Sequence, residues 1–156
     1  MVSCVYDSPV GRLLLSEEDG LLRSIRFPAE NWGEVTWGRT ETLNRTVLAL
    51  DAFFAGTPLP EELPLDHQGT PFQQQVWQAL RTIPWGETRT YGHIARQIGR
   101  PKAARAVGQA CNRNPIPLLI PCHRVVGAKG LTGYAGGLER KGQLLEMENV
   151  HKLQQK

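Results

Sequence analysis

The sequence predicts an α/β fold in two parts, a small sheet with one helix over residues 1–68 and a mostly helical part over residues 69–156. Apolar residues alternate near the N-terminus, which is typical of strands, and later recur at helical spacing. A proline-rich stretch separates the two patterns and marks a boundary near residues 66–69. At 156 residues, the chain suits one domain or two small ones that share an interface.

The first part begins with β structure. Leu13 and Leu15 alternate with other residues, EEDG at 17–20 supplies a turn, and LLRSIRF at 21–27 resumes the pattern. We therefore expect a β-hairpin over this stretch. Residues 31–40 show no regular pattern and should be irregular.

A helix should follow. Apolar residues at i, i+4, i+7 and i+11 define its buried face, which is predicted to carry Leu43, Val47, Leu50 and Phe54. Gly56 ends this helix because glycine is favoured just beyond a helix C-terminus. The next stretch, TPLPEELPLDHQGTP at 57–71, contains four prolines and is either a linker or a loop that wraps around the first part.

The second part opens on a strong helix start. Thr70 can cap the helix, Pro71 suits its first position, and Gln73 completes a T-x-x-Q capping box. The buried face of this helix and its exit is predicted to carry Phe72, Val76, Ala79, Leu80 and Ile83. PWGETRT at 84–90 should form a loop.

Two short helices come next. The first is expected from Tyr91 to Ile98, with Gly99 ending it, and the second over PKAARAVGQACNRN at 101–114. A pair of short helices joined by a glycine-containing turn, the second rich in alanine and arginine, has helix-turn-helix character. An ordinary helical hairpin explains the same pattern, so both interpretations stay open.

The last segments surround a cysteine. The interior of a helix is excluded by Pro115, Pro117 and Pro121, which place Cys122 at a bend. A glycine-rich loop and a final helix follow within LTGYAGGLERKGQLLEMENV at 131–150. We expect the inner face of that helix to carry Leu138, Leu144 and Leu145, with Glu148 near its end.

The net charge of +3 hides an asymmetry between the two parts. Residues 1–66 contain 11 acidic and 5 basic residues, a net charge of −6, whereas residues 67–156 contain 4 acidic and 13 basic residues, a net charge of +9. Seven basic residues and one acidic residue lie between Arg81 and Arg113. Such a basic half suggests a module that binds a polyanion such as nucleic acid, although a solvated charged face has the same composition.

The sequence carries few signals for membranes, export or metals. No apolar run approaches the ~20 residues that a membrane-spanning helix needs, and no secretory signal is visible, so we expect a cytoplasmic protein without a membrane partner. The three cysteines, Cys4, Cys111 and Cys122, do not suggest a disulfide framework. No CxxC or HxxxH pair occurs, so we expect no structural zinc.

Cys122 directly precedes His123 within IPLLIPCHRVV at 116–126. A thiol attacks only as its thiolate, and a neighbouring histidine can accept the proton while a carboxylate such as Glu148 orients the imidazole. Adjacent side chains of an extended segment point to opposite faces, so contact would need either the bend or a bridging water. From these residues alone, Cys122 is a buried spacer, a metal ligand or a nucleophile.

IPCHRVV at 120–126 resembles the active-site signature of O6-alkylguanine-DNA alkyltransferases. The resemblance covers essentially all of residues 70–149 in the family's order and spacing. The matching motifs are PFQQQVW at 71–77, IPWGETRTYGHIA at 83–95, GRPKAARAVGQACNRNPIPLLIPCHRVVG at 99–127 and GYAGGLERKGQLLEME at 133–148. DSPVGRLLLS at 7–16 is less distinctly similar to the family's opening strands. The resemblance implies a ribonuclease-H-like N-terminal domain and a mostly helical C-terminal domain that carries the site.

The resemblance implies chemical roles for five residues. Cys122 would accept the alkyl group, His123 would act as its base through a water, and Glu148 would orient His123. Asn114 matches the asparagine that holds the turn presenting the cysteine. Tyr91 matches the tyrosine that assists nucleotide rotation and can donate a proton to the guanine leaving group.

The resemblance also implies contacts with DNA. Arg105 matches the arginine that fills the gap left by a flipped base, and Lys102 should meet phosphates. The charge of Arg100 suggests the same role as that of Lys102. Small residues such as Ala104 and Gly108 would let the helix that carries them approach a minor groove closely.

The substrate pocket is expected to include Val125, Tyr134 and Ala135. Ala135 departs from the serine often found beside the tyrosine of this loop, so any hydrogen bond to O6 there must come from a backbone N–H. Some family members bind zinc through cysteine and histidine in the N-terminal domain. Because only Cys4 is available near that region, we expect neither zinc nor a cofactor.

The implied function is DNA repair by direct damage reversal, with irreversible transfer of the alkyl group from O6-alkylguanine in double-stranded DNA to Cys122. We expect a monomer, and we leave open cooperative binding to DNA and activity on O4-alkylthymine. A module that binds alkylated guanine without chemistry would lack the cysteine. A hydrolase using Cys122 and His123 would have no purpose for a basic helix, and a transcription regulator rests on the helix-turn-helix alone.

Overall fold

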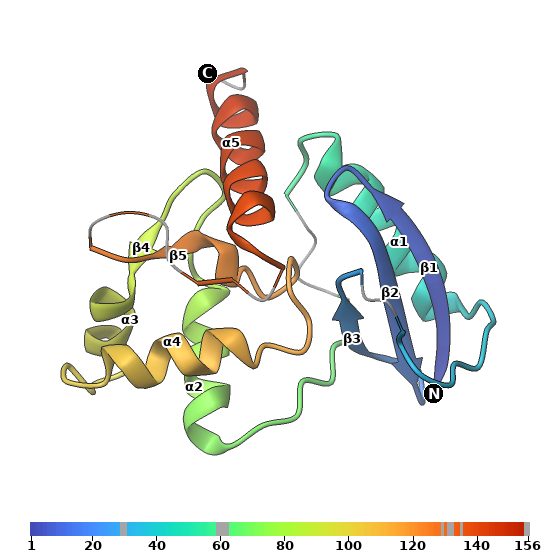
Figure 1. Ribbon diagram of the computed structural model, residues 1–156, viewed down its shortest axis with the longest axis horizontal. Helices are drawn as coiled ribbons and strands as arrows, with labels where there is room; N and C mark the ends of the chain where they lie inside the picture. Colours follow the sequence, from blue (N-terminus) through green and yellow to red (C-terminus); the bar gives the residue numbers. More distant parts are fainter. Residues whose placement is uncertain (29–30, 59–62, 129, 131–132, 135, 155–156) are drawn as a thin grey trace. The chain divides into compact units, whose positions relative to one another are not determined.

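The computed structural model confirms the mixed α/β fold and divides into two compact units, Met1–Gln68 and Gly69–Lys156 (Figure 1). We call them the N-terminal unit and the C-terminal unit. The structure describes residues 1–28, 31–58, 63–128, 130, 133–134 and 136–154.

The N-terminal unit contains a three-stranded antiparallel sheet in the order β1 (Val2–Ser8), β2 (Gly11–Glu18) and β3 (Leu21–Arg26). The predicted hairpin between β2 and β3 is confirmed. Its two-residue turn holds Asp19 and Gly20 at φ values of 54° and 81°, the left-handed conformation that Asp-Gly adopts in tight hairpins.

The middle strand, β2, departs from simple alternation. Leu13 and Leu15 are fully buried as expected, but Leu14, which points to the opposite face of the sheet, is also fully buried. Both faces of β2 are therefore covered, whereas the alternation of Leu13 and Leu15 predicted only one buried face.

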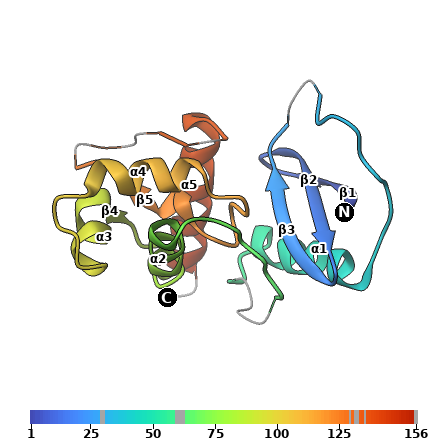
Figure 2. The same cartoon turned by 90° about the horizontal axis from the view of Figure 1, so that it is seen from below.

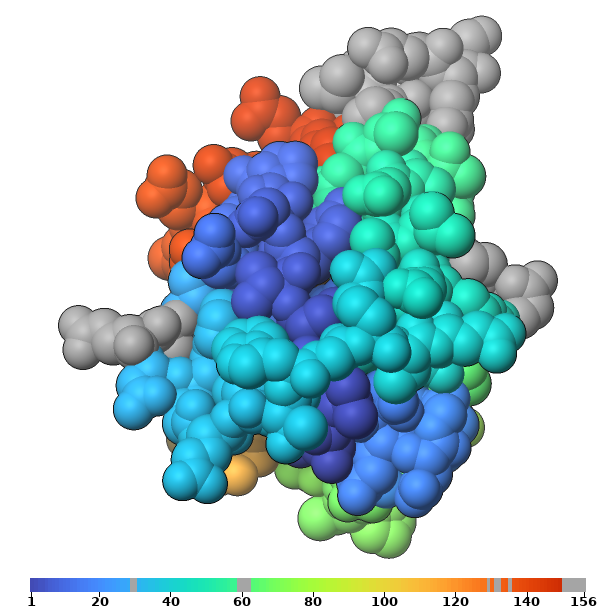
Figure 3. Space-filling view, turned by 90° about the vertical axis from the view of Figure 1, so that its right-hand side faces the viewer, coloured from blue at the N-terminus to red at the C-terminus, as the bar shows by residue number. Residues whose placement is uncertain are grey.

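Helix α1 (Glu41–Phe54) packs against all three strands (Figure 2). In the space-filling view, β1 in dark blue and α1 in teal lie side by side on the face towards the viewer (Figure 3).

The buried face of α1 is rotated from the predicted one. Leu43 and Leu50 are buried as predicted, but Phe53 rather than Phe54 completes the face. Thr46 is buried in place of Val47, because its hydroxyl donates a 2.8 Å hydrogen bond to the Thr42 carbonyl and so hides its polarity.

The proline-rich stretch wraps back onto the N-terminal unit rather than only linking the two units. The backbone N–H of Leu22 donates to the Pro64 carbonyl at 2.8 Å, and the N–H of Asp66 donates to the Leu22 carbonyl at 2.9 Å. Arg23 Nε and Asp66 Oδ2 add an ion pair at 3.0 Å. The chain therefore stays attached to β3 up to the boundary between the units.

The C-terminal unit is mostly helical. Its elements are α2 (Pro71–Leu80), β4 (Arg89–Thr90), α3 (Tyr91–Gln97), α4 (Ala104–Asn112), β5 (Val125–Val126) and α5 (Leu138–Gln154). The prediction of a plain loop over residues 84–90 was wrong at its end, because β4 pairs in parallel with β5. This pairing joins the start of α3 to the segment that carries Cys122.

Helix α2 begins as predicted. Thr70 Oγ1 accepts from Gln73 N at 3.1 Å, and Gln73 Oε1 accepts from Thr70 N at 2.9 Å, completing the capping box. Its buried face differs from the prediction, since Phe72 is only half-buried and Trp77 is almost fully buried. The Trp77 indole N–H donates to the Ala110 carbonyl at 2.9 Å and ties α2 to α4.

Helix α4 begins at Ala104, so the predicted start at residue 101 was wrong. The N–H of Ala103 donates to the Arg100 carbonyl at 2.9 Å, which closes a turn before the helix. Arg100 and Lys102 therefore lie in this turn and not in the first turn of the helix. The preceding helix ends as predicted, with Gly99 at a φ of 78°.

Helix α5 buries a different set of side chains from the predicted one. Leu138 is 51% exposed, whereas Lys141 is fully buried and Leu144 is buried as expected. Glu148 lies inside the helix rather than near its end, because α5 continues to Gln154. The inner face of α5 thus carries two charged side chains, both fully buried.

We expect Thr70→Ala to lower the free energy of unfolding by about 1 kcal/mol, because the substitution removes the hydroxyl that caps α2. Urea unfolding followed by far-ultraviolet circular dichroism measures the change. Thr70→Ser keeps the hydroxyl and is the matched control. An equal loss of stability in both variants would contradict the capping role.

Candidate active site

A tight turn presents Cys122. Pro121 has φ −80° and ψ 64°, and the N–H of Cys122 donates to the Ile120 carbonyl at 2.8 Å. These values define an inverse γ-turn. A single turn of 3-10 helix, Cys122–Arg124, follows it, and Cys122 itself is only 5% exposed.

Asn114 holds this segment from within. Its Nδ2 donates to the Ile120 carbonyl at 2.8 Å, and its Oδ1 accepts from Ile116 N at 3.0 Å. Both hydrogen bonds are buried, so the side chain replaces the backbone partners that a regular element would supply. Asn114 therefore fixes the loop whose end is the turn before Cys122.

His123 and Glu148 form a buried pair. His123 Nε2 lies 2.7 Å from Glu148 Oε2, and both side chains are fully buried. The structure thus brings together two residues that lie 25 positions apart in the sequence. Glu148 reaches the imidazole from the inner face of α5.

Arg124 contacts the same carboxylate. Its Nε donates to Glu148 Oε1 at 2.9 Å, and its Nη2 donates to Glu148 Oε2 at 2.9 Å. Its Nη1 donates to the Ile83 carbonyl at 2.8 Å, and the guanidinium lies 5.9 Å from the centre of the Trp85 ring. Arg124 is a functional candidate that the sequence analysis did not include, and an arginine is normally expected in solvent unless its partner is known.

Burial sets the protonation of the resting site. It lowers the pKa of His123, and the opposing effect of Glu148 only partly offsets this, so the imidazole is neutral at neutral pH. Burial alone would raise the pKa of Glu148, but His123 and Arg124 outweigh it and hold that pKa below its usual value. Burial also raises the pKa of Cys122 to about 11, against smaller lowering effects of Asn114 and Lys141. The site therefore rests as a thiol, a neutral imidazole and a carboxylate.

Lys141 is a second charged residue that the sequence interpretation missed. Its Nζ donates to the Gly133 carbonyl at 3.0 Å and lies 5.8 Å from the centre of the Tyr91 ring. Its charge also lowers the pKa of the Cys122 thiol. The available cue is its spacing, because Lys141 and Glu148 are seven residues apart and so share one face of a helix.

Tyr91 lies where three helices meet. It is the first residue of α3, its ring faces Lys141 of α5, and a Cβ built on Gly108 of α4 would lie 3.7 Å from its Cε1. The absence of a side chain on Gly108 leaves space beside the ring. Gly108 is half-buried against Tyr91 rather than fully exposed.

The predicted DNA-contacting residues lie on and just before α4. Arg105 and Lys102 are exposed, while Ala104 is half-buried. Arg100 is exposed as a residue, and its guanidinium lies 5.8 Å from the centre of the Phe72 ring of α2. Helices α3 and α4 contact each other along this surface.

The predicted pocket residues are only partly described. Val125 is fully buried in β5, and Tyr134 is half-buried. Burial raises the pKa of Tyr134, and the negative charges of Cys122, when it is ionised, and of Glu148 add to the effect. Ala135 lies outside the described residues, so its predicted place in the pocket stays a prediction.

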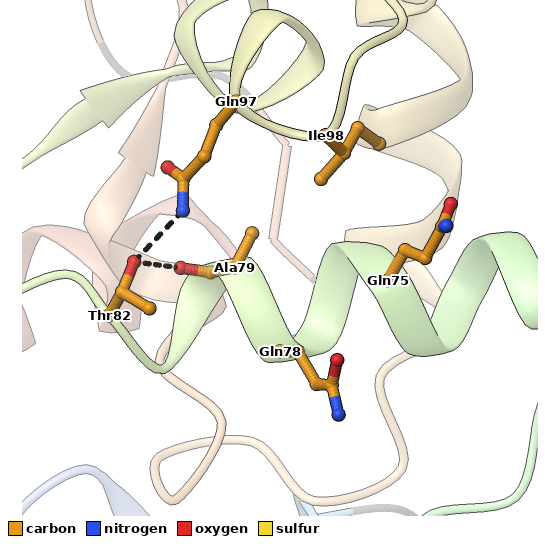
Figure 4. Close-up of a pocket in the computed structure, with 6 residues that line it drawn as sticks. All are labelled: Gln75, Gln78, Ala79, Thr82, Gln97 and Ile98. Atoms are coloured by element: carbon orange, nitrogen blue, oxygen red, sulfur yellow. Dashed lines mark hydrogen bonds between the residues drawn. The ribbon is translucent and has the colours of Figure 1, made fainter.

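A separate polar pocket lies between α2 and the end of α3 (Figure 4). Gln97 Nε2 donates to Thr82 Oγ1 at 3.1 Å, and that hydroxyl donates to the Ala79 carbonyl at 2.6 Å. The remaining lining residues are Gln75, Gln78 and Ile98. Its lining is uncharged and holds none of the predicted site residues.

Comparisons with known proteins decide the family. The family model of the 6-O-methylguanine DNA methyltransferase DNA-binding domain matches residues 71–150, and that of the ribonuclease-like domain of the same family matches residues 1–67. The chain belongs to the 6-O-methylguanine DNA methyltransferase family.

Several known members of this family align with the chain over nearly its full length. It is 49% identical to the methylated-DNA–protein-cysteine methyltransferase of Mycolicibacterium paratuberculosis, over 93% of this chain and 90% of that protein. It is 44% identical to the constitutive enzyme of that name from Bacillus subtilis, over 92% and 93%. The crystal structure of Mycobacterium tuberculosis OGT in complex with DNA aligns with a TM-score of 0.87 at 46% identity, covering 97% of this chain and 94% of that chain.

The structure also bears on metal binding, membrane spans and the state of the cysteines. Within the part of the chain that the structure describes, no group of three or more histidine, cysteine, aspartate or glutamate side chains is placed to hold a metal ion. Over the same residues, no helix is both long enough and apolar enough to cross a membrane. Cys4, Cys111 and Cys122 are all buried free thiols.

The raised pKa of Cys122 has a chemical consequence. We expect the rate of its modification by iodoacetamide in the native protein to keep increasing roughly tenfold per pH unit between about pH 7 and pH 10, because only the thiolate reacts. Timed exposure followed by peptide mass mapping measures this rate.

The control is the same cysteine in urea-unfolded protein, whose ordinary thiol pKa of ~8.5 should make the rate level off above about pH 9. A plateau near pH 8 in the native protein would instead reveal a thiolate that exists before substrate arrives.

Proposed function

We propose that this protein repairs DNA by moving the alkyl group of O6-alkylguanine onto Cys122. The observation that carries the proposal is the buried His123–Glu148 pair beside a cysteine held at a tight turn, in a chain of this family. A thiol next to a neutral base and a fixed carboxylate has the parts of an activated nucleophile.

Activation begins with loss of the Cys122 proton. In a turn of 3-10 helix, successive side chains are about 120° apart, so Cys122 and His123 do not face each other directly. A water between them would carry the proton from the thiol to the neutral imidazole. The Glu148 carboxylate then stabilises the imidazolium, as the acid of a catalytic triad does.

Transfer then proceeds by displacement at the alkyl carbon. The Cys122 thiolate attacks, the sulfur–carbon bond forms, and the bond between that carbon and O6 breaks. The electron pair goes to the guanine, which takes up a proton that Tyr91 can donate. Tyr91 then regains a proton from solvent, to which the His123 imidazolium releases the proton that it took from the thiol. Guanine is restored and Cys122 becomes a thioether, so each protein molecule acts once.

Access to the damaged base requires its rotation out of the duplex, because O6 is out of reach of a thiol inside the base stack. We assign Arg105 to the gap left by the rotated base, and Lys102 and Arg100 to phosphates. Helices α3 and α4 would act as a helix-turn-helix, with Ala104 and Gly108 permitting close approach. Phosphate contacts of this kind make affinity fall with added salt.

The proposal also covers the base pocket, the oligomeric state and the cellular compartment. Val125, Tyr134 and Ala135 would line the space for the rotated base. The protein would act as a monomer on double-stranded DNA, with cooperativity left to measurement. A single-use thiol must stay reduced until damage is found, which favours the cytoplasm.

The direct test is intact mass after incubation with a duplex containing O6-methylguanine. We expect a gain of one methyl group, about 14 Da, on Cys122, and no gain in Cys122→Ser. An unchanged mass with retained DNA binding would favour a module that recognises alkylated guanine without chemistry.

Arg105→Ala separates base rotation from chemistry. Because Arg105 is exposed on α4 whereas His123 and Glu148 are fully buried, we expect slower repair of duplex DNA by about tenfold or more and near-normal reaction with free O6-benzylguanine. Rate constants for both substrates give the comparison. Equal losses on the two substrates would argue against a role at the gap in the duplex.

A further inference from the structure

We propose that Arg124 is a positioning residue for alkyl transfer, which fixes the Glu148 carboxylate against His123 and sets the strength of His123 as a base. The inference rests on the proposed function and deepens it. It concerns a residue that touches neither the thiol nor, in the proposed mechanism, the guanine, and that acts through Glu148.

Arg124 holds the Glu148 carboxylate at two points. The two contacts from Arg124 to Glu148, both 2.9 Å, form a two-point fork that fixes the plane of the carboxylate as well as its distance. The third contact, from Nη1 to the Ile83 carbonyl at 2.8 Å, anchors the guanidinium to the loop after α2. One side chain thus ties Glu148 of α5 to two other segments.

One oxygen of Glu148 contacts both Arg124 and His123. Glu148 Oε2 accepts from Arg124 Nη2 at 2.9 Å and lies 2.7 Å from His123 Nε2. With Arg124 in place, the carboxylate stays ionised and does not compete with the imidazole for the proton of the thiol. The proton therefore stops at His123 rather than passing on to Glu148.

The charge of Arg124 also acts on His123. The charged groups that act on His123 are Glu148, Arg124 and Lys141: the carboxylate favours the imidazolium, and the two cations oppose it. Arg124 thereby helps to keep the resting imidazole neutral and able to accept a proton. Glu148 without Arg124 would favour an imidazolium already formed before substrate arrives.

Packing alone gives no reason for an ion pair at this position. Arg124 is 8% exposed and Glu148 is fully buried, and an apolar pair of similar volume is often as stable as a buried ion pair. A purely structural Arg124 would change the stability of the protein and leave the pH dependence of its reaction unchanged. The pH profile is therefore the measurement that separates the two roles.

The experiment follows single-turnover alkylation of the full chain by free O6-benzylguanine, using intact mass between about pH 5 and pH 9. It compares the wild type with Arg124→Lys and Arg124→Met, and with Arg45→Lys and Arg45→Met as matched controls on the exposed face of α1. The end-point gives the active fraction, so the rate constant holds even for a variant that is partly unfolded.

Arg124→Lys keeps the charge and loses the fork. We expect its plateau rate to fall about tenfold, because the carboxylate is no longer fixed, while the acid limb of the profile keeps its midpoint. Arg124→Met also loses the charge. Its acid limb should move to higher pH, because removing a cation raises the pKa of His123 and the neutral base is then lost at higher pH.

Wild-type plateau rates and an unmoved acid limb in both Arg124 variants would overturn the inference. In that case the wild type would still become alkylated, so the result would refute only the role of Arg124 and leave the proposed function standing. Wild-type protein that gains no mass, from either O6-benzylguanine or alkylated duplex, would refute the proposed function itself.

Discussion

The buried carboxylate of Glu148 is the group on which the rest of the site depends. A lone ionised carboxylate without water would be strongly destabilising, so it must be paired on both sides. Arg124 supplies a fixed positive charge, and His123 supplies a partner whose charge would change in the proposed reaction. The remaining elements serve this arrangement, since α5 brings Glu148 to it and the turn at Pro121 brings His123 and Cys122.

This arrangement keeps the Cys122 thiol, the proposed nucleophile, unreactive in the resting protein. Burial holds the Cys122 thiol protonated and the His123 imidazole neutral, so very little thiolate is available to other alkylating agents or oxidants at neutral pH. A protein that acts once loses its function through any such side reaction. In the proposed mechanism, a proton transfer must accompany attack, and the Glu148 carboxylate would lower the free energy of this step by stabilising the imidazolium.

Local signals in the sequence predicted much of the fold. The capping box of Thr70 and Gln73, the Asp-Gly turn and the glycine after α3 each depend on near neighbours, and the structure confirms them. The errors concern where elements begin and which face is buried. The helix predicted from residue 101 begins only at Ala104, because a turn closed by Arg100 and Ala103 precedes it. In α1, Phe53 is buried in place of Phe54, because contacts with the sheet decide which face of a helix is buried.

The candidate site likewise contains residues that the sequence indicated and residues that only the structure revealed. The Cys-His pair stands out as a motif, and resemblance to a family supplied Glu148 and Asn114. The burial of Arg124 carried no local sign, and that of Lys141 only its helical spacing from Glu148, because a charged residue is normally assigned to solvent unless its partners are known. Their partners, Glu148 and the Gly133 carbonyl, become visible only when α5 is placed against the rest of the unit.

The protonation of His123 in the resting protein tests this account most directly. Nitrogen-15 NMR of the imidazole between about pH 5 and pH 8, assigned by comparison with a His123→Gln variant, reads it without any substrate. The account predicts a neutral ring throughout the neutral range, with a midpoint below the ~6.5 of an ordinary histidine. A protonated ring at pH 7 would leave the imidazole unable to accept the thiol proton and would contradict the account.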